Sequence, residues 1–336
     1  MILVGSEIQA VLSKTLWAAE PTLNSILNHA LAGGKGLRPT LVLLCARFGM
    51  HDTLEVRQVA AAIELIHLAS LIHDDVLDGA TIRRNLPALH CVYGTVPAIL
   101  TGDYLFATAF NLLTDSKKAV LKTVTEAIRS MCSGEIRQLT SGSPNVEAYF
   151  NYIGQKTAVL FSAACRCGAI LCRLKRSQQI NLARFGWHLG LAYQIIDDYL
   201  DLFGSPRLMG KPNRQDLTRG IITLPVLRFL ERAPNAEDWQ VKIQRGLKPA
   251  EIEELVRAAR ELNCDIETAD VAREQVTLAL EALDRLPPNP VQEELVLLAL
   301  KILSPLNHAD PAEEPAEEEE LLRKGPGLLE NNLTCR

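Results

Sequence analysis

The chain has 336 residues, of which 48% are hydrophobic, 5% aromatic and 22% charged, and its formal net charge is −5. This apolar fraction allows a substantial buried core, and the scarcity of aromatics beside abundant alanine and leucine disfavours a β-sandwich. The lack of a basic excess disfavours a nucleic-acid-binding protein.

The N-terminal segment starts apolar but has neither a basic stretch nor a long apolar region, so the sequence predicts no signal peptide. No uninterrupted apolar stretch reaches the length that a bilayer-spanning helix needs. The eight cysteines are scattered without a C-x-x-C pair, which disfavours a zinc or redox motif and is typical of reduced thiols. We therefore expect a soluble, cytoplasmic protein, with contact to a membrane surface left open.

The first chemically distinctive stretch is GGKGLRP at residues 33–39, just before an apolar helical segment. It carries Lys35 and Arg38, but it lacks the G-x-x-x-x-G-K-[ST] spacing of a phosphate-binding P-loop. By itself this stretch is more typical of a turn with two surface cations.

Residues 54–72 contain no Pro or Gly and repeat apolar side chains at helical spacing, which predicts a helix. An acidic cluster, Asp74-Asp75-Val76-Leu77-Asp78, follows at once. His67 lies two turns before this cluster, where a histidine alone is more typical of helix packing than of a ligand. Arg83 and Arg84 follow the cluster within two turns.

The second half of the chain repeats this arrangement. Lys156 and Thr157 begin one helical segment, and residues 180–202 form a longer one that ends in Asp197-Asp198-Tyr199-Leu200-Asp201. Lys211 follows this second acidic cluster. Two further amphipathic segments are residues 251–263 and 290–303.

The connections between these segments are short, and no alternation of period two or hairpin signal is evident. From Asp310 onward, eight acidic residues face three basic ones, so this tail carries the whole net charge and leaves 32 residues of each sign before it. The sequence therefore predicts one all-α domain, residues 1–309, and an acidic, disordered tail, residues 310–336.

Each acidic cluster would concentrate negative charge on one helix face. Four residues advance a helix by slightly more than one turn, so Asp74 and Asp78 share a face, as do Asp197 and Asp201. Such like charges repel and destabilise the helix end unless a cation neutralises them. Magnesium fits, because it prefers oxygen ligands and is usually held by one or two carboxylates together with substrate phosphates.

One such cluster alone is as typical of a solvated helix end as of a metal site. Two clusters with the same D-D-x-x-D spacing, each after an apolar helical run, favour the metal site. Neither has the loop glycine or the glutamate of an EF-hand, which disfavours a calcium loop.

The order of these motifs resembles the trans-type polyprenyl diphosphate synthase family, which includes farnesyl, geranylgeranyl and longer-chain synthases. The resemblance implies an all-α, single-domain helical bundle of the isoprenoid synthase type with a central substrate cavity. The matching stretches are GGKGLRP (33–39), ELIHLASLIHDDVLDGATIRR (64–84), LTGDYLF (100–106), GEIRQL (134–139), QKTAVLF (155–161), YQIIDDYLD (193–201) and GKPNRQDLTRGIITLP (210–225).

The resemblance also implies roles for individual residues. Magnesium would be ligated by Asp74, Asp78 and Asp197, with Asp75, Asp198 and Asp201 as ligands or water-mediated support. The allylic diphosphate would be held by Arg83, Lys156, Gln194 and Lys211, with Thr157 beside them. Isopentenyl diphosphate would be held, without metal, by Lys35, Arg38, His67 and Arg84. Two positions depart from the family pattern: Gly36, often Arg in the family, and Ile221, often Lys.

The residues just before the first cluster bear on product length. An isoprene unit is about as long as one helix turn, about 5 Å, so residues one turn deeper would form the floor of a product tunnel. Ala69 and Ser70 are small, and Ile66, one turn further, is medium-sized. We therefore expect a product longer than geranylgeranyl diphosphate, although small residues here are also consistent with close helix packing alone.

The predicted activity is a head-to-tail condensation of isopentenyl diphosphate with an allylic diphosphate, giving a medium- or long-chain all-trans polyprenyl diphosphate. By resemblance we expect a homodimer. The alternatives are the catalytic subunit of a heteromeric synthase, a short-chain synthase, a terpene cyclase or head-to-head enzyme of the same fold, and an acidic helical scaffold. The complete D-D-x-x-D motifs and the cations disfavour the last two.

Overall fold

A computed structural model of the chain describes residues 2–16, 20–140, 145–204 and 214–307. Apart from two very short strands and one π-helical turn, η1, every regular element in these ranges is an α-helix. In chain order they are α1 (Ile2–Thr15), α2 (Pro21–Leu31), α3 (Leu37–Ala46), α4 (Thr53–Leu77), β1 (Ile82–Arg83), β2 (Leu86–Pro87), α5 (Leu89–Tyr93), α6 (Thr95–Leu113), α7 (Lys118–Thr140), α8 (Val146–Ile153), η1 (Gly154–Ala158), α9 (Val159–Leu171), α10 (Arg176–Phe203), α12 (Gln215–Thr218), α13 (Leu224–Arg232), α14 (Ala236–Gln244), α15 (Pro249–Glu261), α16 (Cys264–Asp284) and α17 (Val291–Asn307).

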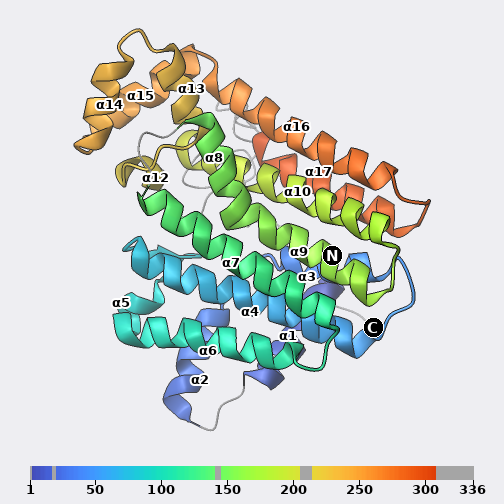
Figure 1. The fold of residues 1–336 in the computed structure, drawn as a ribbon. Helices are drawn as coiled ribbons and strands as arrows, with labels where there is room; N and C mark the ends of the chain where they lie inside the picture. The colour runs from blue at the N-terminus through green and yellow to red at the C-terminus, as the bar shows by residue number, and fades with distance from the viewer. Residues whose placement is uncertain (1, 17–19, 141–144, 205–213, 308–336) are drawn as a thin grey trace, which may run out of the picture.

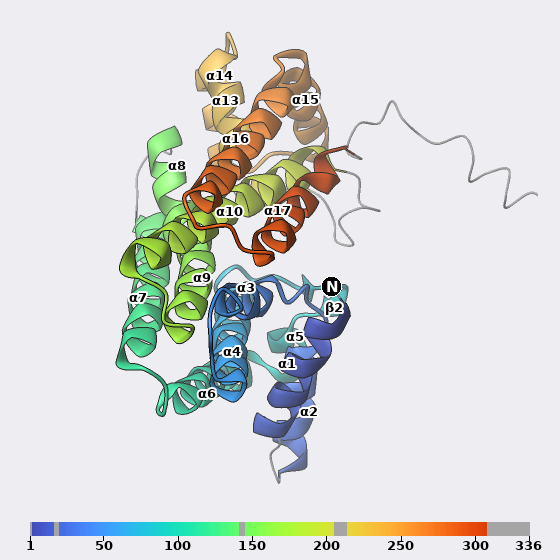
Figure 2. The same cartoon turned by 90° about the vertical axis from the view of Figure 1, so that its right-hand side faces the viewer.

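The helices form a bundle around α4 and α10 (Figure 1). The helix α10 packs between α9 and α16, whereas α4 packs against α6 and α3. At one end of the molecule lie α13, α14 and α15, and at the other end lie α2 and α6 (Figure 2). This arrangement confirms the all-α fold expected from the sequence.

The helices predicted from apolar periodicity are present with slightly different ends. Residues 54–72 lie in α4, which begins after Asp52, whose carboxylate accepts hydrogen bonds from the N–H groups of Leu54 and Glu55 at 2.8 and 3.1 Å. Such an N-cap satisfies amide groups that have no partner inside the helix. Residues 180–202 lie in α10. The segments at 251–263 and 290–303 correspond to α15 and α17.

The prediction that the chain has no hairpin is wrong at residues 82–87, where β1 and β2 pair antiparallel with Ile82 opposite Pro87. Arg84 and Asn85 form the two-residue turn, and both have positive φ, at 52° and 62°. Type I′ hairpin turns need positive φ at both central residues, and asparagine tolerates it well. Strands of two residues are too short to show an alternating pattern in the sequence.

The close packing of α9 and α10 depends on glycine. A Cβ atom on Gly186 would lie 2.5 Å from the carbonyl oxygen of Phe161, and one on Gly190 would lie 2.6 Å from the Cα of Ala158. Both contacts are to backbone, which cannot move aside cheaply. These two glycines, four residues apart on one face of α10, therefore allow the backbones of α9, η1 and α10 to approach closely.

The helix α6 is long and apolar enough to cross a membrane when judged by length and composition alone. The helix is not an uninterrupted apolar stretch, however, so the sequence expectation is not contradicted. Asp103 is the only charged residue in α6, and the helix packs along α4 in the bundle. About a third of its most apolar window (33%) is buried, as in a core helix with one open face.

The buried side chains form one contiguous apolar cluster that includes residues from α1 through α17. Within the described residues this is what a single domain requires. The predicted tail at 310–336 lies outside the described residues, so the boundary at residue 309 stays a prediction.

Candidate active site

The C-terminal ends of α4 and α10 border one large cleft with a volume of about 1910 Å³. Its other walls come from the loop before α3, the β1–β2 turn, α7, η1 and the segment around α12. Both predicted acidic clusters reach the cleft, through Asp74 and Asp78 from α4 and its C-cap and through Asp197 and Asp198 from α10. The fold thus brings together carboxylates that lie far apart in the sequence.

Asp74 lies in a partly desolvated network of opposite charges. Lys156 Nζ is 3.6 Å from Asp74 Oδ2 and 2.8 Å from Glu135 Oε2. Burial raises the pKa of Asp74 to about 6, although Lys156 lowers it. Burial disfavours the charged form of Lys156, but Tyr152, Asp74 and Glu135 outweigh that effect and raise its pKa. Lys156 is therefore firmly a cation, whereas the charged form of Asp74 is costly in this site.

The other two aspartates of the first cluster also face arginines. Arg83 donates from Nε to Asp75 Oδ1 at 2.8 Å and contacts the same oxygen through Nη2. Asp75 is only 4% exposed and does not line the cleft. Arg219 Nη1 lies 3.5 Å from Asp78 Oδ2. Asp75 thus links the β1–β2 hairpin to α4, whereas the side chain of Asp78 lines the cleft.

In the second cluster Asp197 lines the cleft, but Asp198 is 4% exposed and held by two hydrogen bonds. Tyr149 donates its hydroxyl to Asp198 Oδ2 at 2.6 Å, and Gln194 Nε2 donates to Oδ1 at 2.9 Å. Burial, followed by the charge of Asp216, raises the pKa of Asp198 well above its usual value. Tyr149 was not singled out in the sequence, yet it fixes α8 against this carboxylate.

Asp201 holds two elements of the fold together and does not face the cleft. Asp201 is 4% exposed, and its carboxylate accepts hydrogen bonds from the backbone N–H groups of Gln215 at 3.3 Å and Asp216 at 3.1 Å. Its carbonyl oxygen accepts from Arg214 N at 2.7 Å. Asp201 therefore anchors the start of α12 to the end of α10, and it does not line the cleft.

Replacing Tyr149 by phenylalanine should lower the free energy of unfolding by about 1–3 kcal/mol, because the buried Asp198 would lose a donor that its carboxylate needs. Phenylalanine keeps the edge contact with the Phe150 ring, whose centroid is 5.6 Å away. Urea denaturation of the metal-free chain measures the change.

Tyr93→Phe is the matched control for this substitution. The Tyr93 hydroxyl is 3.1 Å from Ser25 Oγ, but that hydrogen bond is exposed, so water replaces it. We expect a change below about 0.5 kcal/mol. Equal losses in the two variants would contradict a special role for the Tyr149–Asp198 contact.

The carboxylates suit a divalent cation that is shared with a phosphate ligand. Within the described residues, no group of three or more His, Cys, Asp or Glu side chains is placed so that it could hold a metal ion by itself. Asp74 and Asp78 nevertheless face the cleft with hard oxygen donors, and burial makes the charge of Asp74 costly. A cation that keeps waters and takes its remaining ligands from phosphate oxygens matches this donor set, as magnesium does.

Elsewhere in the cleft, Arg38 and His67 form a hydrogen-bonded, partly buried pair. Arg38 Nη1 donates to His67 Nε2 at 2.9 Å, and its guanidinium lies 4.5 Å from the centroid of the Phe161 ring. Burial, followed by the charge of Arg38, lowers the pKa of His67 well below its usual value. His67 is therefore neutral and, because Nε2 accepts, carries its proton on Nδ1. Arg38 Nε is buried without a hydrogen-bond partner among the described atoms.

Arg84 packs on the two glycines of the GGKGLRP stretch. Its Nη1 donates to the carbonyl oxygen of Gly33 at 2.7 Å, and a Cβ on Gly34 would lie 2.9 Å from the same nitrogen. A side chain at residue 34 would thus displace Arg84. Lys35 is exposed at the edge of the same pocket, 5.9 Å from the Tyr193 ring centroid.

One acid lies among these cations. Glu64 is 8% exposed and lines the cleft, and burial raises its pKa although Arg38 and Arg84 lower it. Arg38 and Arg84 together with Lys35 exceed this single carboxylate in charge. The pocket is therefore suited to an anion. The buried Arg38 Nε, which has no hydrogen-bond partner, is a donor that such an anion could satisfy.

The π-helical turn η1 carries Lys156 and Thr157 into the cleft wall. Thr157 donates from Oγ1 to Gln194 Oε1 at 2.7 Å, and Gln194 in turn donates to Asp198. A π-turn inserts one extra residue into a helix, which reorients the side chains around it, and such turns are frequent at functional sites.

The three residues predicted to set product length are placed differently. Ser70 lines the cleft, whereas Ala69 and Ile66 are 0% exposed in the core and do not line it. Two apolar residues that the sequence did not single out, Phe106 from α6 and Met131 from α7, also line the cleft. The role in product length stays a prediction for all three residues.

Lys211 lies outside the described residues, so its role stays a prediction. Gly36 precedes α3 with a φ of 57°, and Ile221 lines the cleft. The charged or polar groups of the cleft that were missed in the sequence include Glu64, Glu135, Tyr149 and Arg219. Glu135 lies inside the GEIRQL stretch, Arg219 inside the stretch at 210–225 and Glu64 at the start of the stretch at 64–84, so each offered a signal, but nothing local marked Tyr149 as part of the site.

Comparison with known proteins agrees with this geometry. A family model described as "Polyprenyl synthetase" matches residues 20–262. The chain belongs to this family. As a family member it is a prenyltransferase of the polyprenyl synthase type, and this family depends on a divalent metal.

Three relatives illustrate how far the similarity extends. The chain is 35% identical to heptaprenyl diphosphate synthase component 2 of Geobacillus stearothermophilus, over 84% of this chain and 89% of that protein. It is 33% identical to octaprenyl diphosphate synthase of Escherichia coli, over 80% and 84%. The crystal structure of polyprenyl synthase from Caulobacter crescentus, complexed with calcium and isoprenyl diphosphate, matches with a TM-score of 0.85 and 31% identity over 90% of this chain and 95% of that one. The predicted family and isoprenoid synthase fold are confirmed.

Proposed function

We propose that this chain is a magnesium-dependent synthase that extends an allylic diphosphate with isopentenyl diphosphate to a polyprenyl diphosphate longer than geranylgeranyl. The observation that carries the proposal is a single cleft that joins two acidic helix ends to a separate cation pocket. Relatives named heptaprenyl and octaprenyl diphosphate synthases support the product class.

The acidic side of the cleft suits an allylic diphosphate. Asp74, Asp78 and Asp197 would hold magnesium, which supplies positive charge that stabilises the departing diphosphate. Lys156 is held as a cation at the cleft wall, and the cation Arg83 lines the same cleft. These two side chains bind and orient the leaving diphosphate oxygens as the C1–O bond breaks.

The cation pocket suits isopentenyl diphosphate without a metal, because Arg38, Arg84 and Lys35 already outweigh Glu64. Neutral His67 keeps Arg38 in place without adding to the charge. Binding at this pocket presents the isopentenyl double bond to the allylic cation. A new carbon–carbon bond forms, and a proton leaves the isopentenyl unit.

We assign no side chain as the base for that proton. The departing diphosphate has negative oxygens next to the reaction and is the acceptor in this proposal. The apolar side chains that line the cleft, including Phe106 and Met131, exclude water from the cation until the proton is lost.

The decisive experiment is incubation of the purified chain with farnesyl diphosphate, isopentenyl diphosphate and magnesium, followed by mass spectrometry of the dephosphorylated products. We expect a ladder that ends beyond geranylgeranyl length and disappears with EDTA. A stop at farnesyl or geranylgeranyl length would support the short-chain alternative. No extension by the chain alone would favour the heteromeric alternative, for which the relative named as a component 2 is a precedent.

We also propose that the chain forms a homodimer through α6. This helix leaves apolar side chains open to solvent, with Val96 66%, Leu100 60% and Ile99 41% exposed. A twofold axis would pair such a face with itself, and exposed apolar patches on one helix commonly mark an interface.

Leu100→Arg should therefore raise the dimer dissociation constant at least about a hundredfold, because the interface would bury an unpaired charge. Sedimentation velocity across a dilution series measures the change. Ile266→Arg on α16, where the side chain is 55% exposed, is the control and should leave the dimer intact. A wild-type chain that sediments as a monomer would reject the proposal.

Finally, we propose that the protein works in the cytoplasm, with its lipid product released at a membrane surface. All seven cysteines within the described residues are free thiols, and five of them are buried. Reduced cysteines are normal in the cytosol. Fractionation of cells that produce the chain tests this proposal.

A further inference from the structure

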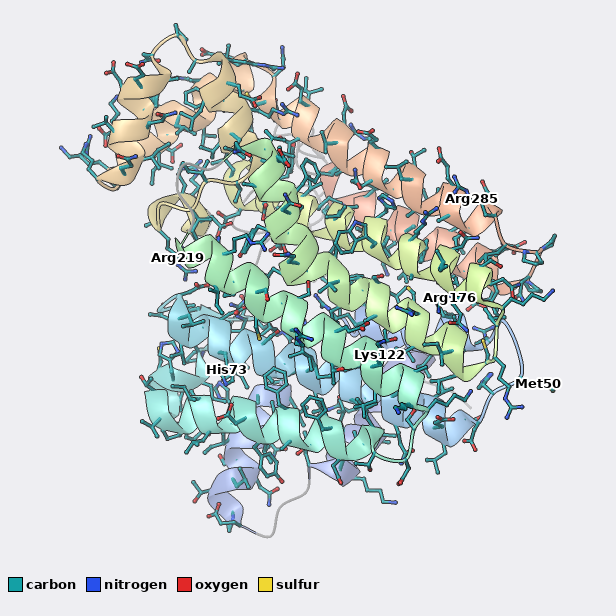
Figure 3. The ribbon with its side chains drawn as sticks, in the orientation of Figure 1. Met50, His73, Lys122, Arg176, Arg219 and Arg285 are labelled. Carbon is teal, nitrogen blue, oxygen red and sulfur yellow. The ribbon has the colours of Figure 1, made fainter. Side chains whose placement is uncertain are left out.

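The three aspartates of the first cluster each have one cation from a different element. Lys156 from η1 faces Asp74, Arg83 from β1 faces Asp75, and Arg219 faces Asp78. Figure 3 labels Arg219 beside α12, on the same side of the molecule as His73 near the end of α4. The proposed function gives diphosphate-binding roles to the first two cations. Arg219 is the third cation that faces an aspartate of this cluster, and the proposed function gives it no role.

The contact with Asp78 is too weak to explain by itself why an arginine stands at residue 219. It is one Nη1–Oδ2 approach of 3.5 Å, and the two side chains are 29% and 28% exposed. Such a partly solvated, loosely aligned pair adds little stability. Arg83, by comparison, contacts Asp75 through two nitrogens. Arg219 lines the cleft, and its side chain has no polar partner other than Asp78 within the described residues.

The backbone around Arg219 is fixed by the second acidic cluster. Asp201 accepts hydrogen bonds from the first N–H groups of α12, as described above. One turn later, Arg219 N donates to the carbonyl oxygens of Gln215 and Asp216, each at 3.1 Å. Gly220 then turns the chain with a φ of 74°. Asp201 thus sets where Arg219 stands at the cleft edge.

We propose that Arg219 is a diphosphate-binding residue, which moves from Asp78 to the diphosphate of the allylic substrate. The proposal rests on the proposed function. When the carboxylate of Asp78 turns toward a divalent cation, Arg219 loses its partner while phosphate oxygens arrive beside it. The planar guanidinium matches two such oxygens at once, which an ammonium group does not.

The neighbouring residues support this assignment. Among the described residues from 214 to 232 that line the cleft, Arg219 is the only cation. Ile221, two positions later, is apolar and also lines the cleft. The positive charge that this wall offers to a diphosphate within the described residues therefore comes from Arg219.

The test is calorimetric titration of inorganic pyrophosphate into the full chain with magnesium present. Arg219→Gln should bind pyrophosphate about tenfold more weakly than the wild type, and Arg219→Lys should fall between them. The matched control is Arg228→Gln: Arg228 on α13 is also 29% exposed, but it donates to Glu231 at 2.8 Å and does not line the cleft. Its affinity should equal that of the wild type.

Steady-state kinetics add a second readout. In Arg219→Gln the KM for farnesyl diphosphate should rise about tenfold while the KM for isopentenyl diphosphate is unchanged, because the latter binds in the separate cation pocket. An equal rise in both KM values with a lower melting temperature would show a structural role and overturn the proposal.

The remaining outcomes also decide the matter. Unchanged pyrophosphate affinity in Arg219→Gln, an equal loss in Arg228→Gln, or no pyrophosphate binding by the wild type would each overturn the assignment. If the wild type binds pyrophosphate through Arg219 but extends no allylic primer, the binding residue stands and the proposed function fails.

Discussion

Asp74→Asn should lower the rate of condensation by about a hundred- to a thousandfold while leaving the chain folded. The neutral amide keeps the shape of the side chain, but it is a poor ligand for magnesium and cannot help to hold the charge that stabilises the departing diphosphate. Metal-assisted charge stabilisation contributes several kcal/mol to such reactions, and each 1.4 kcal/mol is about tenfold in rate. Single-turnover assays with farnesyl and isopentenyl diphosphates measure the loss.

The same substitution should stabilise the metal-free chain. Burial raises the pKa of Asp74 from the usual 3.8 of an aspartate to about 6. Because the folded chain keeps the proton more tightly than the unfolded chain, the contribution of Asp74 to stability falls as the pH rises through this interval. Above pH 6 the folded chain carries the full cost of the buried charge, and asparagine removes it.

Urea denaturation in EDTA at pH 7.5 should therefore show Asp74→Asn more stable than the wild type by up to about 3 kcal/mol. The gain should be absent near pH 4. Asp115→Asn, at an exposed position after α6, is the control and should change neither activity nor stability. A variant that is both inactive and unstable would mean that Asp74 serves the fold, and the assignment as a metal ligand would be lost.

The long helices were predictable because their apolar residues repeat over several turns. The helices α4 and α10 end in acidic clusters, and the requirement to neutralise these charges is enough to predict a cation site between them. The sequence could not divide the six aspartates by task. Asp75 and Asp201 have the same spacing as their neighbours, yet one binds Arg83 and the other anchors α12.

The parts of the site that were missed depend on contacts between distant segments. The small hairpin at residues 82–87 has strands too short for a pattern, although it aims Arg83 at α4 and Arg84 at the glycine loop. Tyr149 and Arg219 meet their partners only because α8 and α12 fold back onto α10. Single-sequence patterns report local period and charge, not such tertiary pairings.

Ser70→Phe should shorten the product to geranylgeranyl or farnesyl length. Ser70 lies one helix turn before Asp74 and lines the cleft. A phenyl ring there would fill the space into which the growing chain extends, and each isoprene unit needs about 5 Å. Mass spectrometry of products made from farnesyl diphosphate measures the shift, with overall turnover of short products retained because the diphosphate sites are unchanged.

Comparison with Ala69→Phe separates a tunnel floor from helix packing. Ala69 is 0% exposed within α4, so a ring there must displace packed side chains and should cost about 1–3 kcal/mol in stability. Leu77→Phe, at a cleft-lining position that is 60% exposed, places the same phenyl ring away from the floor and should leave product length unchanged. If Ala69→Phe shortens the product and Ser70→Phe does not, the growing chain runs along the other face of α4, and the cleft lined by Phe106 and Met131 would not be its path.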